Sequence, residues 1–347
     1  MKNVGIYDRH GYINWGTLFA QGTPFIICVG GRGIGKTYGV LKWCLDNKKR
    51  FIYMRRTQKQ LDIINTEEFS PFKPINRDCG LHIKSFSVTQ YNTAFFDTEE
   101  KDGKVVCKSD LLGYSAALST FSSLRSFDAS DVDILIYDEF IPERHERAIK
   151  QEATAFFNAV ETISRNREIT GGNPLQVVLL SNSNDVANPI FKELKLIDRA
   201  LRQVKDGKEI FYDHKRGLML VTPCNSPISE AKESTALYRL TADTAFRRMA
   251  LSNDFTENVP SRIGARNLRE YTPIVKVGEV TIYRHKNAEN FYCTTHNSGS
   301  PPVYNVDDTS LKRFCRRYKY LYFAYMQNNI IFETYNAEVC LAKYFAT

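Results

Sequence analysis

Residues 25–37 read FIICVGGRGIGKT. The five residues before the first glycine form an unbroken apolar run, which is typical of a strand buried on both faces of a parallel sheet. The remaining eight match the pattern G-x-x-x-x-G-K-[ST], in which glycines let backbone N–H groups converge on phosphate oxygens at the start of a helix. We expect this loop to bind a nucleotide through Gly30, Gly31, Arg32, Gly33, Ile34, Gly35, Lys36 and Thr37.

Two side chains of this loop have distinct expected roles. Lys36 is expected to reach the β- and γ-phosphates, and the Thr37 hydroxyl is expected to ligate Mg²⁺. A glycine-rich turn that binds no nucleotide is the alternative interpretation. The apolar strand before the loop and the helical pattern over 36–44 after it favour the nucleotide site.

A second apolar strand, 134–137, ends in Asp138-Glu139 about 100 residues after the loop. Asp138 is expected to hold Mg²⁺ through water, and Glu139 to orient and deprotonate the attacking water, because phosphoryl transfer depends mainly on positioning and charge. The alternative is an apolar strand that merely ends in acids. A glutamate directly after the aspartate favours hydrolysis by water over transfer to a substrate hydroxyl, so we predict an ATPase that uses ATP and Mg²⁺.

Polar residues at the ends of two further elements fit ATP hydrolysis. Ser181-Asn182 follow the predicted strand 176–180, and Asn182 can hydrogen-bond the water or the γ-phosphate; a turn-forming pair is the alternative. Arg165 lies at the end of the predicted helix 151–164, and an arginine supplied to a neighbouring subunit can raise turnover by about 10³–10⁵. The alternative is that Arg165 only complements the partial negative charge of the helix C-terminus.

The remaining patterns divide the chain into two domains joined by a linker. Residues 1–200 alternate strands and helices, as in a parallel α/β sheet, and KDGK at 101–104 indicates a hairpin loop. Between 201 and 234 the periodicity fades while polar residues and prolines accumulate, so we expect a linker there. Residues 235–347 form the predicted C-terminal domain. Its expected elements are a helix over 235–251, β-like stretches over 274–283 and 290–295, and C-terminal helices.

Composition excludes several classes of protein. In 347 residues no apolar run approaches the roughly 18 residues of a membrane-spanning helix, and the N-terminus lacks the apolar segment of a secretory signal. The eight cysteines form no C-x-x-C pair, which favours reduced thiols in a soluble intracellular protein. The net charge is +8, and from Thr235 onward 15 Lys+Arg against 10 Asp+Glu give +5, so we expect a basic C-terminal face.

The strongest basic segment is LKRFCRRYKYL at 311–321. On a helix, its apolar residues share one face and its cations the other. We expect these cations to contact the phosphates of a nucleic acid; they are Lys312, Arg313, Arg316 and Arg317, with Lys319 beside them. A solvated helix face is the alternative. Near the predicted strand 51–54, Arg56 and Lys59 are expected to lie beside the ATP crevice in a loop that grips DNA.

Together these segments resemble the phi29-like phage DNA encapsidation ATPases, small relatives of the terminase large subunits. Their order and approximate spacing agree over about residues 20–195. The matching stretches are GGRGIGKT at 30–37, FIYMRR at 51–56, IYDEFI at 136–141, RNRE at 165–168, and LSN at 180–182 through Asn188-Pro189.

The resemblance implies an α/β fold of the P-loop NTPase class (additional-strand, RecA/terminase-like), followed by a smaller α+β domain. It implies a homomeric ring, expected to be a pentamer, at the portal of an empty capsid, where it pumps double-stranded viral DNA inward. The arginine finger of the family falls on Arg165, and a second basic residue that acts across the subunit interface falls on Arg125. The expected location is the host cytoplasm, transiently at the portal vertex, and not the mature virion.

The resemblance also concerns the C-terminal domain, which in such proteins is RNase H-like, has lost nuclease chemistry and contacts nucleic acid and the capsid machinery. In the phi29-like case a capsid-bound packaging RNA takes part, and the sequence leaves open whether this chain uses one. A working nuclease needs several carboxylates around two metals. The candidates show no motif spacing, so nuclease activity is not expected; they are Asp243, Asp254, Asp307, Asp308 and Glu333.

Two other functions stay open at this point. One is another P-loop ATPase of phage assembly or secretion, and the other is a nucleotide-binding scaffold that does not hydrolyse. The RNRE stretch at 165–168 and the arginines after the second strand favour DNA packaging over the first. The intact set of Lys36, Thr37, Asp138 and Glu139 argues against the second.

Overall fold

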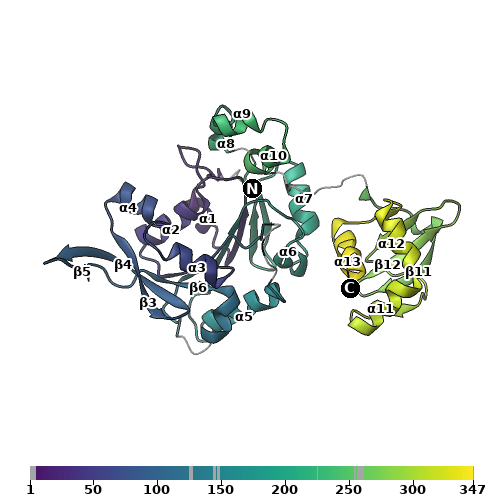
Figure 1. The fold of residues 1–347 in the computed structure, drawn as a ribbon, viewed down its shortest axis with the longest axis horizontal. Coiled ribbons are helices and arrows are strands. Elements are labelled where there is room, and N and C mark those ends of the chain that lie inside the picture. The colour runs from purple at the N-terminus through teal and green to yellow at the C-terminus, as the bar shows by residue number, and fades with distance from the viewer. Residues whose placement is uncertain are drawn as a thin grey trace. The chain divides into compact units, whose positions relative to one another are not determined.

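The computed structural model describes residues 5–124, 128–143, 146, 149–224, 226–253, 255 and 262–346. The chain divides into two compact units (Figure 1). The first contains Met1–Ile190 and Ala200–Thr256, and the second contains Phe191–Arg199 and Glu257–Thr347. Every helix in the described ranges is too short or too polar to cross a membrane.

The described part of the first unit is built on a ten-stranded sheet whose centre is parallel. In spatial order, the parallel strands are β6 (Gly113–Ala117), β2 (Phe51–Arg55), β7 (Ile134–Asp138), β8 (Gln176–Ser181), β1 (Phe25–Val29) and β10 (Leu218–Val221). The predicted α/β class with a parallel sheet is confirmed. Because the carboxyl ends of parallel strands meet at one edge, residues that follow β1, β7 and β8 can converge there.

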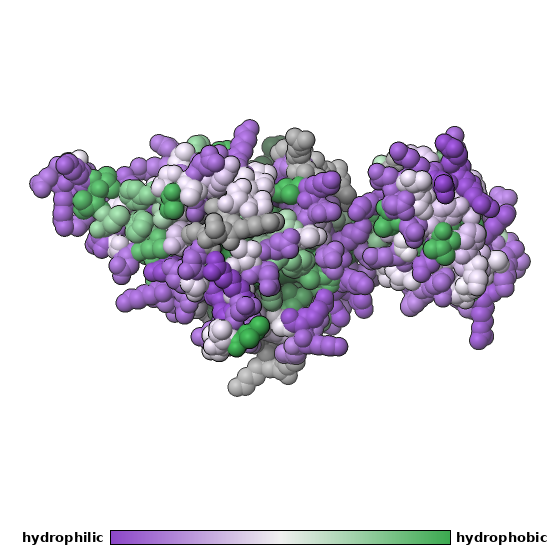
Figure 2. Space-filling model, turned by 90° about the horizontal axis from the view of Figure 1, so that it is seen from below, coloured by the Kyte–Doolittle hydropathy of each residue, from purple (hydrophilic) through white to green (hydrophobic). Residues whose placement is uncertain are grey.

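Antiparallel strands extend both edges of this sheet. β3 (Ile83–Thr89) and β4 (Asn92–Lys101) add to β6, and β9 (Ile210–Asp213) adds to β10. The predicted hairpin at 101–104 is present, because Lys101 pairs with Lys104 at the start of β5 (Lys104–Cys107). Apolar surface gathers at this end of the unit, on the left of Figure 2, where Phe86, Val88 and Val105 are exposed.

Helices cover the sheet and connect its strands. A continuous apolar cluster packs α1 and α2 on the strands through Leu18, Val40, Leu41, Ile26 and Cys28, all almost completely buried. The helices that lie wholly in this unit are α1 (Trp15–Phe19), α2 (Lys36–Asp46), α3 (Gln58–Ile64), α4 (Lys73–Cys79), the 3₁₀ helix Leu118–Leu124, α5 (Glu152–Ser164), α8 (Pro227–Glu233), α9 (Ala236–Leu240) and α10 (Ala245–Ser252). Two more helices, α6 (Pro189–Glu193) and α7 (Ile197–Lys205), belong partly to this unit and partly to the second.

The predicted linker at 201–234 is wrong. This range contains the end of α7, both strands at one edge of the sheet, and α8, and all of it belongs to the first unit. β10 pairs with β1 in parallel, with Leu218 opposite Phe25. Its four residues are buried, but so short a strand between polar segments gives little periodic signal. The single helix predicted over 235–251 is interrupted after Leu240, and α10 begins at the Thr244 cap, whose side chain accepts from Arg247 N–H.

The second unit has a five-stranded sheet in its described residues, in the order β14-β11-β12-β13-β15. Its strands are β11 (Tyr271–Val277), β12 (Val280–His285), β13 (Phe291–Thr294), β14 (Val303–Tyr304) and β15 (Ile330–Phe332). The predicted β-like stretches and terminal helices are confirmed. The helices are α11 (Asp308–Arg317), α12 (Lys319–Met326) and α13 (Tyr335–Phe345), and they pack on the sheet around Val275, Ile282, Phe314 and Leu341.

Arg56 was expected to grip DNA, and this prediction is wrong because the side chain is fully buried. Its Nε and Nη2 donate to the two carboxylate oxygens of Glu152 at 2.7 and 2.9 Å, and Nη1 donates to Glu146 at 2.9 Å. Tyr137 donates to the same Glu152 carboxylate at 3.0 Å. Removing one member of this cluster would leave a buried charge unpaired, which is strongly destabilising. Arg56 therefore links the end of β2 to the start of α5, and its buried guanidinium group is not accessible to phosphate.

Candidate active site

The loop at 30–37 connects β1 to α2 as predicted, and its backbone requires glycine at two positions. Gly33 and Gly35 have φ values of +70° and +84°, a left-handed conformation that costs side-chain-bearing residues free energy. Gly35 caps α2, whose first residue is Lys36. The N–H groups at this helix start have no partner within the helix, and together with the helix dipole they favour an anion.

Lys36 is almost completely buried, and its side chain reaches back to the start of the loop at 30–37. Its Nζ donates to the carbonyl oxygens of Gly30 and Gly31 at 2.8 and 2.6 Å and to Asn182 Oδ1 at 3.0 Å. Burial lowers the pKa of Lys36 to about 8, against the attraction of nearby Asp138. The three acceptors of the Lys36 ammonium group, two backbone carbonyl oxygens and one amide oxygen, are all uncharged. The contact also confirms that the end of β8 brings Asn182 to the loop.

Thr37 and Asp138 meet at the same edge of the sheet. Thr37 Oγ1 donates to Asp138 Oδ2 at 2.8 Å, and Tyr53 donates its hydroxyl to the same oxygen at 2.7 Å. Burial and the carboxylate raise the pKa of Tyr53 well above its ordinary range, so the phenol stays protonated. A hydroxyl and a carboxylate side by side are the hard oxygen donors that Mg²⁺ prefers, so the donor set fits this ion.

Glu139 lies beside this pair at the end of β7. Its φ is +54°, and its side chain is 51% exposed and forms an ion pair with Arg55. Partial burial raises the pKa of the Glu139 carboxyl, and Arg55 opposes that rise. A carboxylate with a raised pKa is better matched to accept a proton near neutral pH. To act as a base, it must first leave the guanidinium group.

These residues line one cavity of about 300 Å³. The predicted residues that it brings together are Arg32, Gly33, Gly35, Lys36, Thr37, Asp138, Glu139 and Asn182. Ser181 also lines the cavity, and its buried hydroxyl oxygen has no hydrogen-bond partner among the described residues. A buried polar atom without a partner indicates a place for a bound polar group.

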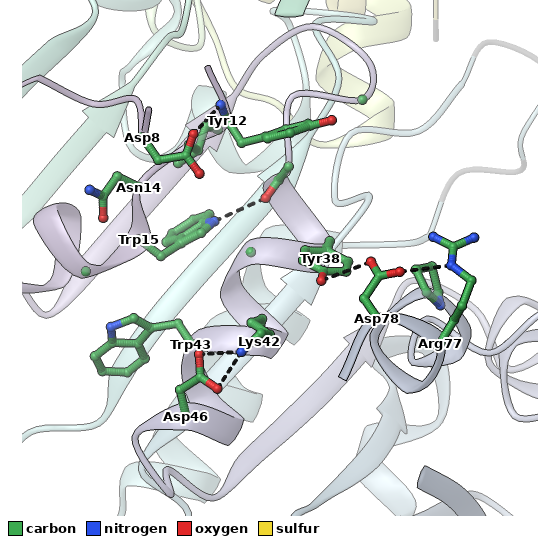
Figure 3. A pocket seen from close by; sticks show the side chains of 16 residues that line it. Asp8, Tyr12, Asn14, Trp15, Tyr38, Lys42, Trp43, Asp46, Arg77 and Asp78 are labelled. Atoms are coloured by element: carbon green, nitrogen blue, oxygen red, sulfur yellow. Dashed lines mark hydrogen bonds and ion pairs between the residues drawn. The ribbon is translucent and has the colours of Figure 1, made fainter. Parts of the chain in front are cut away.

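A larger cavity of about 660 Å³ adjoins the first, and Gly33, Gly35 and Tyr38 line both (Figure 3). Its walls come from the segment 8–16, α2 and α4. The ring of Tyr12 packs against Gly35, where a Cβ would lie 3.1 Å from Tyr12 Cβ, and Trp15 Nε1 donates to the Gly35 carbonyl at 3.4 Å. Sequence reasoning missed this cavity, because nothing local in 8–16 indicates that it folds beside the loop.

Arg165 lies far along the sheet from this site within its own chain. It caps the C-terminus of α5, and its Nη1 is 3.7 Å from Asp128 Oδ1. Two residues on, Arg167 donates to the carbonyl of Val132 at 2.7 Å, just before β7 begins. α5 therefore returns to the amino end of β7, opposite the edge that carries Asp138. The second predicted trans residue, Arg125, lies outside the described residues.

The predicted basic face is exposed on the second unit. α11 buries Leu311 and Phe314 and exposes the four cations Lys312, Arg313, Arg316 and Arg317. Tyr318 and Leu321 continue the buried face after the break between α11 and α12. On the first unit, Lys59 is exposed on α3. Both sets are accessible to a polyanion.

The candidate carboxylates of a nuclease do not form a metal site within the described ranges, where no cluster of three or more His, Cys, Asp or Glu suits a metal ion. Glu333 accepts from Thr294 and lies 3.4 Å from His296 Nε2, while Asp307 caps α11 and Asp308 opens it. Asp243 belongs to the first unit, and Asp254 lies outside the described residues.

The segment α8–α10 covers the loop at 30–37, although sequence reasoning assigned part of this segment to the linker. Arg32 donates its backbone N–H to the Ala250 carbonyl at 3.1 Å, and Asn253 Nδ2 donates to the Val29 carbonyl at 2.8 Å. Lys232 Nζ donates to the Arg32 carbonyl. No sequence motif marks these residues, because their contacts join segments about 200 positions apart.

Comparison with curated proteins finds relatives in Bacillus phages. The DNA packaging protein of phage B103 is 28% identical over 293 residues, which is 82% of this chain and 82% of that protein. The DNA packaging protein of phage phi29 is 26% identical over 232 residues, 65% of this chain and 60% of that protein.

Solved structures share the fold over almost the whole chain. The bacteriophage Phi-29 viral genome packaging motor assembly gives a TM-score of 0.67 at 21% identity and covers 96% of this chain and 98% of that one. The Phi-28 gp11 DNA packaging motor gives 0.63 at 19% identity, with coverage of 97% and 98%. The family model described as Podovirus DNA encapsidation protein (Gp16) matches residues 7–295. The chain therefore belongs to the Gp16 family of podovirus DNA encapsidation proteins.

Proposed function

We propose that this chain is a Mg²⁺-dependent ATPase that drives double-stranded viral DNA into an empty capsid. The observation that carries the proposal is the cavity where Lys36, Thr37, Asp138 and Glu139 converge at the carboxyl edge of the parallel sheet. Relatives named as DNA packaging proteins, and membership of the encapsidation family, support DNA as the cargo.

The chain's own groups would divide the work of hydrolysis among them. The N–H groups at the start of α2 and the Lys36 ammonium would hold the β- and γ-phosphates, with Lys36 exchanging its carbonyl acceptors for phosphate oxygens. Thr37 and Asp138 would hold Mg²⁺, which neutralises charge on the phosphates. Glu139, once released by Arg55, would orient the attacking water and take its proton, while Asn182 would contact the γ-phosphate or the water.

Replacing Glu139 by Gln tests the base. The amide keeps the shape of the side chain but cannot accept the proton, so ATP binding should stay near that of the wild type and turnover should fall by about 10²–10⁴. Steady-state hydrolysis and equilibrium binding of ATP measure the two quantities. Glu100→Gln, on the exposed hairpin, is the matched control. Turnover of E139Q within twofold of the wild type would remove Glu139 from the mechanism.

The cavity of about 660 Å³ is proposed to hold the nucleoside. It opens from the phosphate cavity at Gly33 and Gly35, as a ligand with a base and a phosphate chain requires. Tyr12, 43% exposed, lines this cavity (Figure 3) and packs against Gly35, which lines both cavities, so its ring can stack on a base.

Tyr12→Ala tests this placement. Loss of a base–aromatic contact costs about 1–3 kcal/mol, so the Kd for ATP should rise by about 5- to 150-fold. Binding of inorganic tripolyphosphate, which has no base, should not change. Phe69→Ala is the control, because this ring is 67% exposed and lies outside the lining of either cavity. Equal losses for ATP and tripolyphosphate would show that Tyr12 acts on the phosphate loop and does not contact the base.

We further propose that the subunits form a homomeric ring, expected to be a pentamer, in which Arg165 acts on the site of a neighbour. Arg165 lies at the end of α5, near the amino end of β7, whereas the loop at 30–37 of the same subunit lies at the carboxyl ends of the strands. Its side chain is half exposed and can reach a site on another subunit. Arg125, proposed as the second trans residue, rests on the family resemblance.

Mixing two inactive variants tests the action in trans. Arg165→Ala should lower turnover by about 10³ or more, and Lys36→Ala should abolish it. In mixed rings a Lys36→Ala subunit still donates its Arg165, so part of the activity should return. Fluorescently labelled subunits show that mixed rings form. If mixed rings form and turnover returns at none of the mixing ratios, Arg165 does not act across the interface.

The exposed cations of α11, and Lys59 on α3, are proposed to contact DNA phosphates. Four cations on one helix face, opposite a buried apolar face, give a continuous site for a polyanion. The proposed partner on the capsid is the portal, and the proposed location is the host cytoplasm with transient attachment at the portal vertex. A packaging RNA is compatible with this proposal and is not required by it.

The salt dependence of DNA binding tests the α11 face. Each phosphate contact contributes about 0.9 to the slope of log Kd against log salt, so Arg316→Gln with Arg317→Gln should reduce the slope by about 2. Arg269→Gln with Lys286→Gln removes the same charge from exposed positions outside the face and is the control. Equal slopes for the wild type and the R316Q/R317Q variant would show that Arg316 and Arg317 do not contact DNA and that this face of α11 is only solvated.

A further inference from the structure

Lys232 extends from α8 to the phosphate-binding loop and lies against it. Its Nζ donates to the carbonyl of Arg32. The approach is so close that a Cβ on Gly33 would lie 2.2 Å from Nζ and 3.3 Å from Cε of this lysine. Glycine at position 33 thus makes room for the ammonium group as well as adopting a left-handed backbone.

The ammonium group lies against Gly33, a residue that lines both cavities, although Lys232 itself is not in the lining of either. Gly33 lines both the phosphate cavity and the proposed nucleoside cavity, and Arg32 lines the phosphate cavity. Lys232 is also near enough to Lys36 for its charge to help lower the pKa of Lys36. A phosphate chain that runs from one cavity to the other along Gly33 would come close to this ammonium group.

The hydrogen bonding of Lys232 leaves its charge unmatched. An ammonium group has three N–H donors, and among the described residues the recorded acceptor is the neutral Arg32 carbonyl. No carboxylate of the described residues forms an ion pair with Lys232. Glu143 binds the Arg32 guanidinium group at 2.9 Å instead. Partial burial lowers the pKa of Lys232, as expected for a cation that has lost water without gaining an anion.

The position of α8 is fixed independently of this lysine. Ser226, the residue before α8, donates its hydroxyl to the Gly11 carbonyl at 3.1 Å, and a Cβ on Gly11 would lie 2.8 Å from Pro227 Cβ. The backbone of α8 therefore rests on the same segment that carries Tyr12. Lys232 is held out toward the loop by a helix that does not need its contact to stay in place.

We propose that Lys232 is a second substrate-contacting cation, which binds the phosphate chain of the nucleotide where the nucleoside and phosphate cavities meet. Lys36 would hold the chain from within the loop, and Lys232 would hold it from α8. The inference rests on the proposed nucleotide site. It adds that the segment α8–α10 contributes a charge to ATP binding.

Three substitutions separate this contact from a purely structural one. Lys232→Gln keeps an N–H donor for the Arg32 carbonyl but removes the charge, and Lys232→Arg keeps both. Lys205→Gln is the matched control, because Lys205 is exposed at the end of α7, outside both the loop at 30–37 and the segment α8–α10. The readouts are the Kd of the nonhydrolysable analogue AMP-PNP with Mg²⁺, turnover of ATP, and the unfolding temperature of the nucleotide-free protein.

A charge-assisted contact to phosphate predicts that K232Q loses about tenfold or more in AMP-PNP affinity, with lower turnover and an unchanged unfolding temperature. K232R should retain most of the affinity, and K205Q should match the wild type. Wild-type affinity in K232Q would overturn the inference, and so would a loss of affinity accompanied by a lower unfolding temperature. If the wild-type chain itself binds no AMP-PNP, the proposed function fails first.

Discussion

The hydrogen bond between Thr37 and Asp138 is the contact on which the site depends. It joins the last residue of the loop at 30–37 to the end of β7, a strand that is separated from β1 by β8. Only a parallel arrangement of β7, β8 and β1 brings their carboxyl ends to one edge, and there Asn182 and Lys36 also meet. The buried strands hold this geometry, so the fold itself places the Thr37 hydroxyl beside the Asp138 carboxylate, the two groups proposed to hold Mg²⁺.

Much of this arrangement could be predicted because its signals are local. The apolar run of β1, the glycines at 33 and 35 and the acids after β7 each lie within a few consecutive residues. Parallel-sheet topology then determines which of them meet. The buried and exposed faces of α11 follow in the same way from helical spacing, since Leu311 and Phe314 are buried and the cations between them are exposed.

The parts that could not be predicted depend on partners far apart in the sequence. β10 is four residues long and is recognisable as a strand only beside β1, so its surroundings resembled a linker. Arg56 follows an apolar strand next to Arg55, and nothing local distinguishes the arginine that pairs with buried Glu152 from the one that pairs with Glu139. Lys232 has no motif, because its significance comes from the loop it contacts, about 200 residues earlier.

The most direct test of the account is a crystal structure with AMP-PNP and Mg²⁺. In the proposed site, Lys36 Nζ leaves the carbonyl oxygens of Gly30 and Gly31 for phosphate oxygens, and Thr37 and Asp138 lie around the metal ion. A nucleotide bound elsewhere, with Lys36 still on its loop carbonyls and the hydrogen bond from Thr37 to Asp138 unchanged, would contradict it.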